Sequence, residues 1–493
     1  MRLKTRPEDF IVREAYHFEK AARGAHYVYL MDKQKLSTLE AIHRVAEAND
    51  LPPHAISFCG LKDKQGRTEQ IIAVDGKAVE HQEPNLRLKF LGRTKEPLSA
   101  ANLRANRFVV TVRDLTLDEA ERIPASVVEV RRSGVINYFD SQRFGSVKHG
   151  QGYVVRDLLQ GRSEDALRQL IARPSRLDKS EDARVKAFWA RHWGEWKRRC
   201  SLPAARTYEP IIRSLRENPR DFLKAFGAME TRRRTLLLFE FQSLLWNETA
   251  RIFLEEAYAR ERLLALRYQA GIQRFPRPDP EERAEVDTGP SLAQLRKIQL
   301  PLLGPDTELT DPRIAAAVNK VLKKQRLKLS DLKLPAAARM VFKDEPRALV
   351  VKPTRLSVVN PRPDELNPGR VKISLAFTLP SGAYATLVVR RVMWFADSEV
   401  RDWGGPLPEA HGDFLSEELR REVHSRFSRA QGRRRNRRPR AFKGIAVEET
   451  REERATRAPT PRRGPAKGRG PAPRSAEGSR KPAAPRGGGR GGR

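Results

Sequence analysis

The segment LLLFEFQSLLWNETARIFLEEA, residues 236–257, is the strongest helical signal in the sequence. Its apolar side chains surround much of the helix instead of forming one stripe, which is typical of a buried helix. The surrounding residues, from about 150 to 270, are also helical in texture and rich in arginine. We therefore expect a helical middle built around this segment.

Strand patterns lie on both sides of the helical middle. Alternation of Phe108, Val110 and Val112 with their neighbours predicts a strand with one buried face. Ser37 and Glu40 form a capping box that predicts the start of a helix. Further strands are expected at 10–14, 27–30, 55–58, 69–74, 348–351, 371–378 and 384–389, and a polar, proline-rich surface loop at 274–290. The pattern predicts an α+β protein, with one domain inserted into another or with separate domains in series.

The charge is strongly positive and unevenly spread. The 493 residues include 96 Lys and Arg against 62 Asp and Glu, a net charge of +34. Residues 431–493 hold 20 basic and 5 acidic side chains, a net of +15, and the remaining +19 lies in residues 1–430. Such an excess indicates a polyanionic partner, and nucleic acid ranks above a membrane surface.

The C-terminal tail differs in composition from the rest of the chain. Residues 451–493 contain no aromatic residue and are dominated by Arg, Pro, Gly and Ala. They cannot bury enough apolar surface to offset the entropy of ordering, so we expect residues 431–493 to be disordered. The ending GGGRGGR is typical of segments that bind RNA without sequence preference. A tail that only improves solubility is the alternative.

Several classes of protein are excluded. Two cysteines, Cys59 and Cys200, cannot build a disulfide framework, which favours a reducing compartment. No spanning helix or signal peptide is apparent, so the sequence predicts a cytoplasmic protein without membrane contact. No His or Cys pair has metal-ligand spacing and no phosphate-binding loop is complete, so we expect neither a metal nor a cofactor.

Asp63 is the first candidate for chemistry. It lies in the turn GLKDKQGRT, residues 60–68, between two short predicted strands and beside Lys62 and Lys64. Two adjacent cations should favour the carboxylate and attract a phosphodiester. An ionised aspartate held beside RNA is a plausible nucleophile or base. Local sequence alone favours the alternative, an exposed aspartate in a charged turn.

Two further segments combine aromatic and polar side chains. NYFDSQRFG, residues 137–145, could stack on bases, hydrogen-bond base edges and pair with phosphate. A buried aromatic turn is an equal alternative. FTLPSGAYATLVVRR, residues 377–391, is interpreted as a strand that breaks at a turn and resumes at Tyr384, either a plain hairpin or a binding element. The candidate RNA-binding residues of the first segment are Asn137, Gln142, Arg143 and Phe144.

Five motifs occur in order along residues 4–391. They are KTRPEDF at 4–10 with Glu14, GLKDK at 60–64 followed by TEQ at 68–70, NRF at 106–108, GVINYFDSQRFG at 134–145, and LAFTLPSGAYATLVVR at 375–390. Together they resemble the TruD family of tRNA pseudouridine synthases. The sequence departs from the family pattern at Ala105 and Asp140, where Gly is usual, and at Ile136, where Pro is usual.

The resemblance implies an activity and roles for individual residues. It places the catalytic aspartate at Asp63 and a contact with the target uracil at Phe108, with Asn106 beside it. Lys4, Phe10 and Glu14 correspond to further active-site residues. Lys62 and Lys64 could then hold neighbouring phosphates, while pairing of Asp63 with Lys4 is an equal possibility. The implied substrate is tRNA, most readily uridine 13, and the isomerisation needs no cofactor.

The resemblance also implies a domain organisation. A catalytic domain with a mixed sheet would comprise residues 1–133 and part of 346–430, interrupted by a largely helical TRUD domain at 134–345. We expect a monomer. Two alternatives stay open: a non-catalytic RNA-binding protein or RNA chaperone on the same fold, and a synthase that acts at another RNA site.

Overall fold

Both ends of the described chain contribute to one mixed ten-stranded sheet. The computed structural model describes residues 1–145, 152–175, 178–277 and 290–394. The strand order is β14-β16-β7-β1-β4-β2-β6-β5, with β15 paired to β16 and β3 paired to β4. Only β1 and β4 run parallel within this sheet; its other pairs are antiparallel. The strands are β1 (Phe10–Tyr16), β2 (His26–Gln34), β3 (Ile56–Phe58), β4 (Arg67–Asp75), β5 (Gln82–Glu83), β6 (Leu86–Thr94), β7 (Leu103–Leu115), β14 (Thr354–Val358), β15 (Arg362–Pro363) and β16 (Val371–Leu379).

The buried face of the sheet follows the predicted alternation. Val12 of β1 and Phe377 of β16 both lie opposite Phe108 of β7. Phe108, Val110 and Val112 are all buried, which confirms the one-sided pattern of this strand. β7 therefore joins the N-terminal strands to those from the end of the described chain.

The first helix begins where the sequence predicts. α1 (Thr38–Ala48) has Ser37 as its N-cap, and Glu40 completes the capping box. Its buried residues Ile42 and Val45 belong to the same apolar cluster as Ile72 and Val74 of β4. This packing fixes the helix against the strands on either side of the loop that carries Asp63.

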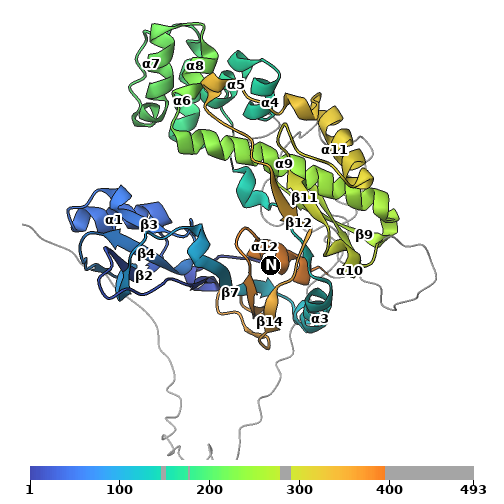
Figure 1. Cartoon of the computed structure of the whole chain (residues 1–493). Coiled ribbons are helices and arrows are strands. Elements are labelled where there is room, and N and C mark those ends of the chain that lie inside the picture. The colour runs from blue at the N-terminus through green and yellow to red at the C-terminus, as the bar shows by residue number, and fades with distance from the viewer. Residues whose placement is uncertain (146–151, 176–177, 278–289, 395–493) are drawn as a thin grey trace, which may run out of the picture. The chain divides into compact units, whose positions relative to one another are not determined.

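The middle of the chain is built around the long helix α9 (Thr231–Ala257), which Figure 1 shows in green. Most of its length is buried, as its apolar circumference predicts, and it packs against α11 (Pro312–Gln325), β10 (Gly271–Pro276) and β11 (Gln299–Leu302). The other helices are α2 (Leu117–Glu121), α3 (Ile123–Ser133), α4 (Val154–Leu159), α5 (Ser163–Ile171), α6 (Ser180–Arg191), α7 (Glu209–Glu217), α8 (Phe222–Gly227), α10 (Leu292–Leu295), α11 (Pro312–Gln325) and α12 (Ala385–Val392).

Three short antiparallel pairs accompany these helices. They are β9 (Leu263–Tyr268) with β10 (Gly271–Pro276), β11 (Gln299–Leu302) with β12 (Glu345–Ala348), and β8 (Val135–Ile136) with β13 (Val350–Val351). In the last pair Ile136 lies opposite Val350 and Val135 lies opposite Val351. The chain therefore enters and leaves its helical middle through two paired strands.

Two sequence predictions are wrong. Residues 384–389 were expected to form a strand, yet α12 begins at Ala385, because burial against α3 and β8 outweighs the strand preference of its valines. Arg274, expected in a surface loop, is buried in β10. Residues 278–289 of that loop, part of the proposed 346–430 segment and the whole 431–493 tail lie outside the described residues. Within the described residues, no helix is both long and apolar enough to cross a membrane.

Candidate active site

Asp63 lies in the loop between β3 and β4, and its charge partner comes from the N-terminal segment. The ammonium of Lys4 pairs with Asp63 Oδ2, and the two side chains are only 16% and 15% exposed. The Lys4 ammonium also lies 4.1 Å from the centre of the Phe10 ring. Lys4 adopts a left-handed backbone conformation, with φ of 54°. The site thus holds a largely enclosed carboxylate–ammonium pair against an aromatic ring.

The two lysines that flank Asp63 pair with other carboxylates. Lys62 Nζ lies 2.6 Å from Glu14 Oε1, and Lys64 Nζ lies 2.5 Å from Glu40 Oε1. The hydrogen bond from Lys64 is the largest cause that lowers the pKa of Glu40 to about 2. Lys62 and Lys64 are therefore paired with carboxylates of β1 and α1. The cation paired with Asp63 is Lys4 instead.

The backbone of the loop is anchored from α1 and β4. Lys62 N donates to Thr38 Oγ1 over 2.9 Å, and Thr38 Oγ1 in turn donates to Gln70 Oε1 over 2.8 Å. Gln70 Nε2 donates to Gly60 O over 3.2 Å. At the other end of the loop, a Cβ on Gly66 would overlap the carbonyl oxygen of Phe10. These contacts fix the backbone on both sides of Asp63.

A buried lysine of β2 donates a hydrogen bond to the backbone of this loop. Lys33, which is 1% exposed, donates to Asp63 O over 3.1 Å and to Leu36 O over 2.6 Å. Burial lowers the pKa of Lys33 to about 8, and the charge of Asp63 partly opposes this shift. No local pattern in the sequence predicts a role for Lys33, because a lysine in a strand is usually solvated.

Three phenylalanines from three adjacent strands form a buried group, of which Phe10 contacts Lys4. The Phe108 ring lies 5.5 Å from that of Phe377 in a stacked arrangement and 6.1 Å from that of Phe10. Asn106, two residues before Phe108, lies opposite Glu14. Its Oδ1 is buried and accepts no hydrogen bond from any described residue. The structure therefore brings together Lys4, Phe10, Glu14, Lys62, Asp63, Asn106 and Phe108.

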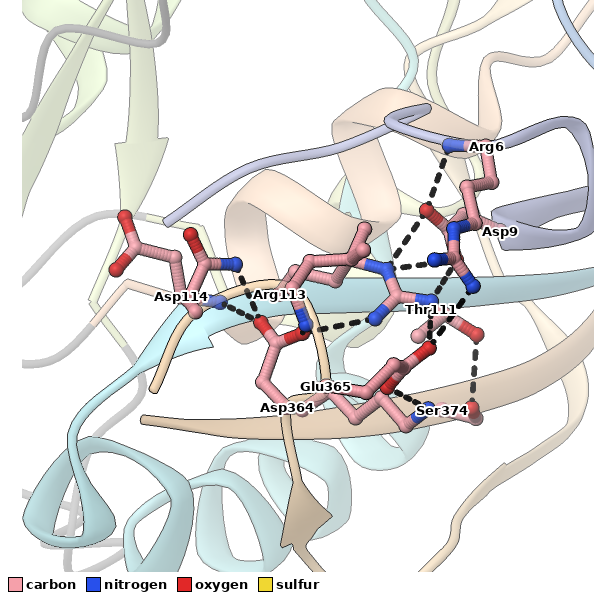
Figure 2. Close-up of polar contacts among 11 residues, drawn as sticks. Arg6, Asp9, Thr111, Arg113, Asp114, Asp364, Glu365 and Ser374 are labelled. Atoms are coloured by element: carbon pink, nitrogen blue, oxygen red, sulfur yellow. Dashed lines mark hydrogen bonds and ion pairs between the residues drawn. The ribbon is translucent and has the colours of Figure 1, made fainter. Parts of the chain in front are cut away.

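Arg113 of β7 secures the segment that carries Lys4. Its guanidinium lies 2.8 Å from Asp9 Oδ1, 2.8 Å from Asp364 Oδ1 and 3.1 Å from Glu365 Oε1 (Figure 2). Its backbone also exchanges hydrogen bonds with Arg2. These carboxylates raise the pKa of Arg113, so it stays charged. The Lys4 segment is consequently held on both sides, at Arg2 and at Asp9.

Comparison with known proteins identifies the chain. A family model described as "tRNA pseudouridine synthase D (TruD)" matches residues 1–392. The chain belongs to the TruD family. It is therefore a tRNA pseudouridine synthase, an isomerase, as the sequence motifs predict.

Individual TruD relatives agree over most of the chain. "Probable tRNA pseudouridine synthase D 1" of Methanococcus maripaludis is 30% identical over 401 residues, covering 80% of this chain and 99% of that protein. The tRNA pseudouridine synthase D of Aquifex aeolicus is 28% identical and covers 80% of this chain and 98% of its own. A TruD crystal structure from Methanosarcina mazei has the same fold, with a TM-score of 0.59, 24% identity and coverage of 80% and 93%.

The second set of predicted residues of this TruD protein forms a separate group. Asn137 is buried and bonds the backbone of Ala348 and Leu349. Phe144 is fully buried and packs edge-on against Tyr268. Gln142 is exposed and Arg143 is half-buried. No hydrogen bond or ring contact within the described ranges joins these four residues to the Asp63 group.

The three departures from the TruD pattern are accommodated locally. Asp140 is buried, lies 2.7 Å from Arg390 Nη1 and accepts a hydrogen bond from Thr386. Ile136 is buried in β8. Ala105 lies in β7 and is not among the described residues with positive φ, so its Cβ meets no backbone penalty. The charge of Asp140 is neutralised by Arg390 within the protein.

Proposed function

We propose that this TruD protein converts uridine 13 of tRNA to pseudouridine and that Asp63 is the catalytic carboxylate. The observation that carries the proposal is the Lys4–Asp63 pair, enclosed beside Phe10 in a loop that is anchored at both ends. A partly shielded carboxylate in a fixed position is the group that attack on a sugar or base requires.

The reaction rearranges one nucleotide. The bond between N1 and C1′ breaks, the uracil turns, and C5 bonds to C1′; C5 then loses its proton to water and N1 takes up a proton. Asp63 serves either as a nucleophile on the sugar or base, or as the base that removes a ribose proton. Both roles need a carboxylate held in a fixed position, and the ammonium of Lys4 pairs with Asp63 there. One proton leaves and one is taken up, so water is the only species exchanged and no other co-reactant is needed.

The surroundings of Asp63 suit a flipped base. A target uridine must leave its stack to reach an enclosed carboxylate. The aromatic group of Phe10, Phe108 and Phe377 offers apolar contact, and one base on an aromatic side chain is worth about 1–3 kcal/mol. The free Oδ1 of Asn106 is an acceptor that the uracil N3–H can satisfy. We assign substrate contact to Asn106 and Phe108 on these grounds.

We also propose the domain organisation that the family pattern implies. The TRUD domain occupies residues 134–345, and the pairing of β8 with β13 supports an insertion there. One apolar cluster nevertheless extends from the sheet into the helical middle, so the two parts share a core. The basic tail adds non-specific RNA contacts, and the enzyme acts as a monomer.

The test compares wild-type and Asp63→Asn proteins in cells that lack the chromosomal gene. Pseudouridine mapping of total RNA should show a signal at tRNA position 13 with the wild type and none with the variant. Survival of the signal would show that Asp63 is not the catalyst. A wild-type signal at another RNA position would establish a different substrate, and no wild-type signal anywhere would favour an RNA chaperone.

A further inference from the structure

Two arginines meet beside Phe139, away from the ion pairs of the Asp63 site. Arg347, from β12, has its guanidinium carbon 4.1 Å from the centre of the Phe139 ring, and that of Arg143 lies at 5.6 Å. Arg143 Nε donates to the hydroxyl of Tyr384 over 3.1 Å, and the Tyr384 ring packs edge-on against Phe139. Both guanidiniums thus lie close to the same aromatic ring.

All acceptors that the described residues offer to these two guanidiniums are neutral. Arg347 donates to Asn137 O over 3.0 and 2.8 Å, to Asn137 Oδ1 over 2.8 Å and to Gly382 O over 3.1 Å. Neither Arg143 nor Arg347 has a carboxylate within salt-bridge distance in the described part of the chain. The nearby Asp140 is already paired with Arg390. Within the described residues, the site therefore carries two positive charges that no carboxylate compensates.

Most of the other buried arginines are compensated by a carboxylate, although Arg234 also donates only to neutral acceptors among the described residues. Arg113, Arg251 and Arg390 are each almost completely buried, and each pairs with at least one carboxylate. A shielded cation is costly unless a partner compensates it. Burial lowers the pKa of Arg347 to about 10, and repulsion by Arg143 adds to this effect. An anion placed between the two arginines would relieve both costs.

Donors remain available for such an anion. Among the described residues, Arg347 Nη1 and both Nη atoms of Arg143 donate no hydrogen bond, and none of these atoms is a buried orphan. Two guanidiniums with free outer N–H groups match the oxygens of a phosphate, which guanidinium binds in a planar, bidentate manner. Phe139, which is buried, lies close to both guanidiniums.

We propose that Arg143 and Arg347 form a binding site for one phosphodiester of the tRNA backbone. The ligand is a phosphodiester because the family substrate is tRNA, and the inference rests on the proposed function to that extent. Asn137 accepts a hydrogen bond from Arg347, and Tyr384 accepts one from Arg143. These two polar side chains therefore position the two arginines. Arg347 lies outside the motifs that identified the family.

The first experiment measures the binding of a tRNA transcript as a function of salt. Each phosphate contact contributes about 0.9 to the slope of log K against log salt. Arg347→Gln and Arg143→Gln should each weaken binding about tenfold and lower the slope, and Arg347→Lys should retain the slope. Arg313→Gln, which removes an exposed arginine paired with Asp311 on α11, is the control for net charge. An equal loss of slope in the control would overturn the assignment.

The second experiment locates the phosphate. Transcripts with single neutral methylphosphonate linkages are bound to the wild type and to both variants. One linkage should weaken binding to the wild type but not to Arg347→Gln or Arg143→Gln. If every linkage that weakens wild-type binding also weakens binding to the variants, the site does not hold a phosphodiester. Modification of position 13 by the wild type is scored on the same unsubstituted transcript, so failure of the proposed function is detected separately.

Discussion

The ammonium of Lys4 pairs with the carboxylate of Asp63 across 59 positions of sequence. Lys64, the next residue after Asp63, points instead to Glu40. The partner of the proposed catalytic group is thus supplied by tertiary structure, because the N-terminal segment is fixed to β7 through Asp9 and Arg113. Mutation of Lys4 and mutation of Lys64 can therefore distinguish the partner of Asp63 in the site from its neighbour in the sequence.

Replacement of Lys4 should impair the chemical step. We expect Lys4→Gln to lower the single-turnover rate about 10- to 100-fold, because Asp63 loses its ion-pair partner and its fixed position. The affinity for tRNA should change only a few-fold. The rate can be followed by tritium release from tRNA labelled at C5 of uridine. Lys64→Gln is the matched control and should retain near wild-type rates, so equal losses in the two variants would contradict a specific role for Lys4.

The two glycines that bound the loop should differ in their tolerance of a side chain. A Cβ on Gly66 would overlap the carbonyl oxygen of Phe10, whereas a Cβ on Gly60 would meet only the end of the Lys62 side chain at 3.9 Å. We expect Gly66→Ala to lower the free energy of unfolding by about 1–3 kcal/mol and to reduce activity. Gly60→Ala should be nearly neutral. Urea denaturation and the tritium assay test both, and the reverse order would show that the loop is held differently.

The sequence predicts the framework of this site better than its contacts. Alternation gives the buried face of β7, and the capping box gives the first residue of α1, because both depend on local patterns. The positions of Lys4, Lys62 and Lys64 around Asp63 depend on which carboxylates three separate elements present. Local sequence holds no information on those distances.

Tertiary burial also explains the residues that sequence patterns missed. The valines of α12 favour a strand, but the segment after the turn at Gly382 is buried as a helix. Lys33 and Arg347 are charged residues in strands, for which solvent exposure is the usual expectation. Their importance appears only when their partners are known.

The stability contribution of Lys33 should depend on pH. Its pKa is lowered to about 8 in the folded protein, while the unfolded chain keeps the ordinary value near 10.5. Between these values the unfolded state binds more protons, so rising pH stabilises the folded state, by at most about 1.4 kcal/mol per pH unit. The free energy of unfolding of the wild type relative to Lys33→Met should therefore increase from pH 8 to 10. A constant difference would contradict this shift; Lys64→Met controls for loss of an exposed lysine.

Restoring the usual family glycine at position 140 should destabilise this protein. Asp140 and Arg390 are both buried and paired, and Thr386 and the backbone of Ser141 also donate to Asp140. Asp140→Gly leaves the Arg390 charge without its partner, which typically costs about 3–5 kcal/mol. The double variant Asp140→Gly/Arg390→Met removes that charge and should recover part of the loss in thermal or urea unfolding. Catalysis by the folded fraction should persist in both, because neither residue contacts Asp63. If Asp140→Gly is as stable as the wild type, the Asp140–Arg390 pair does not contribute to the stability of the folded protein.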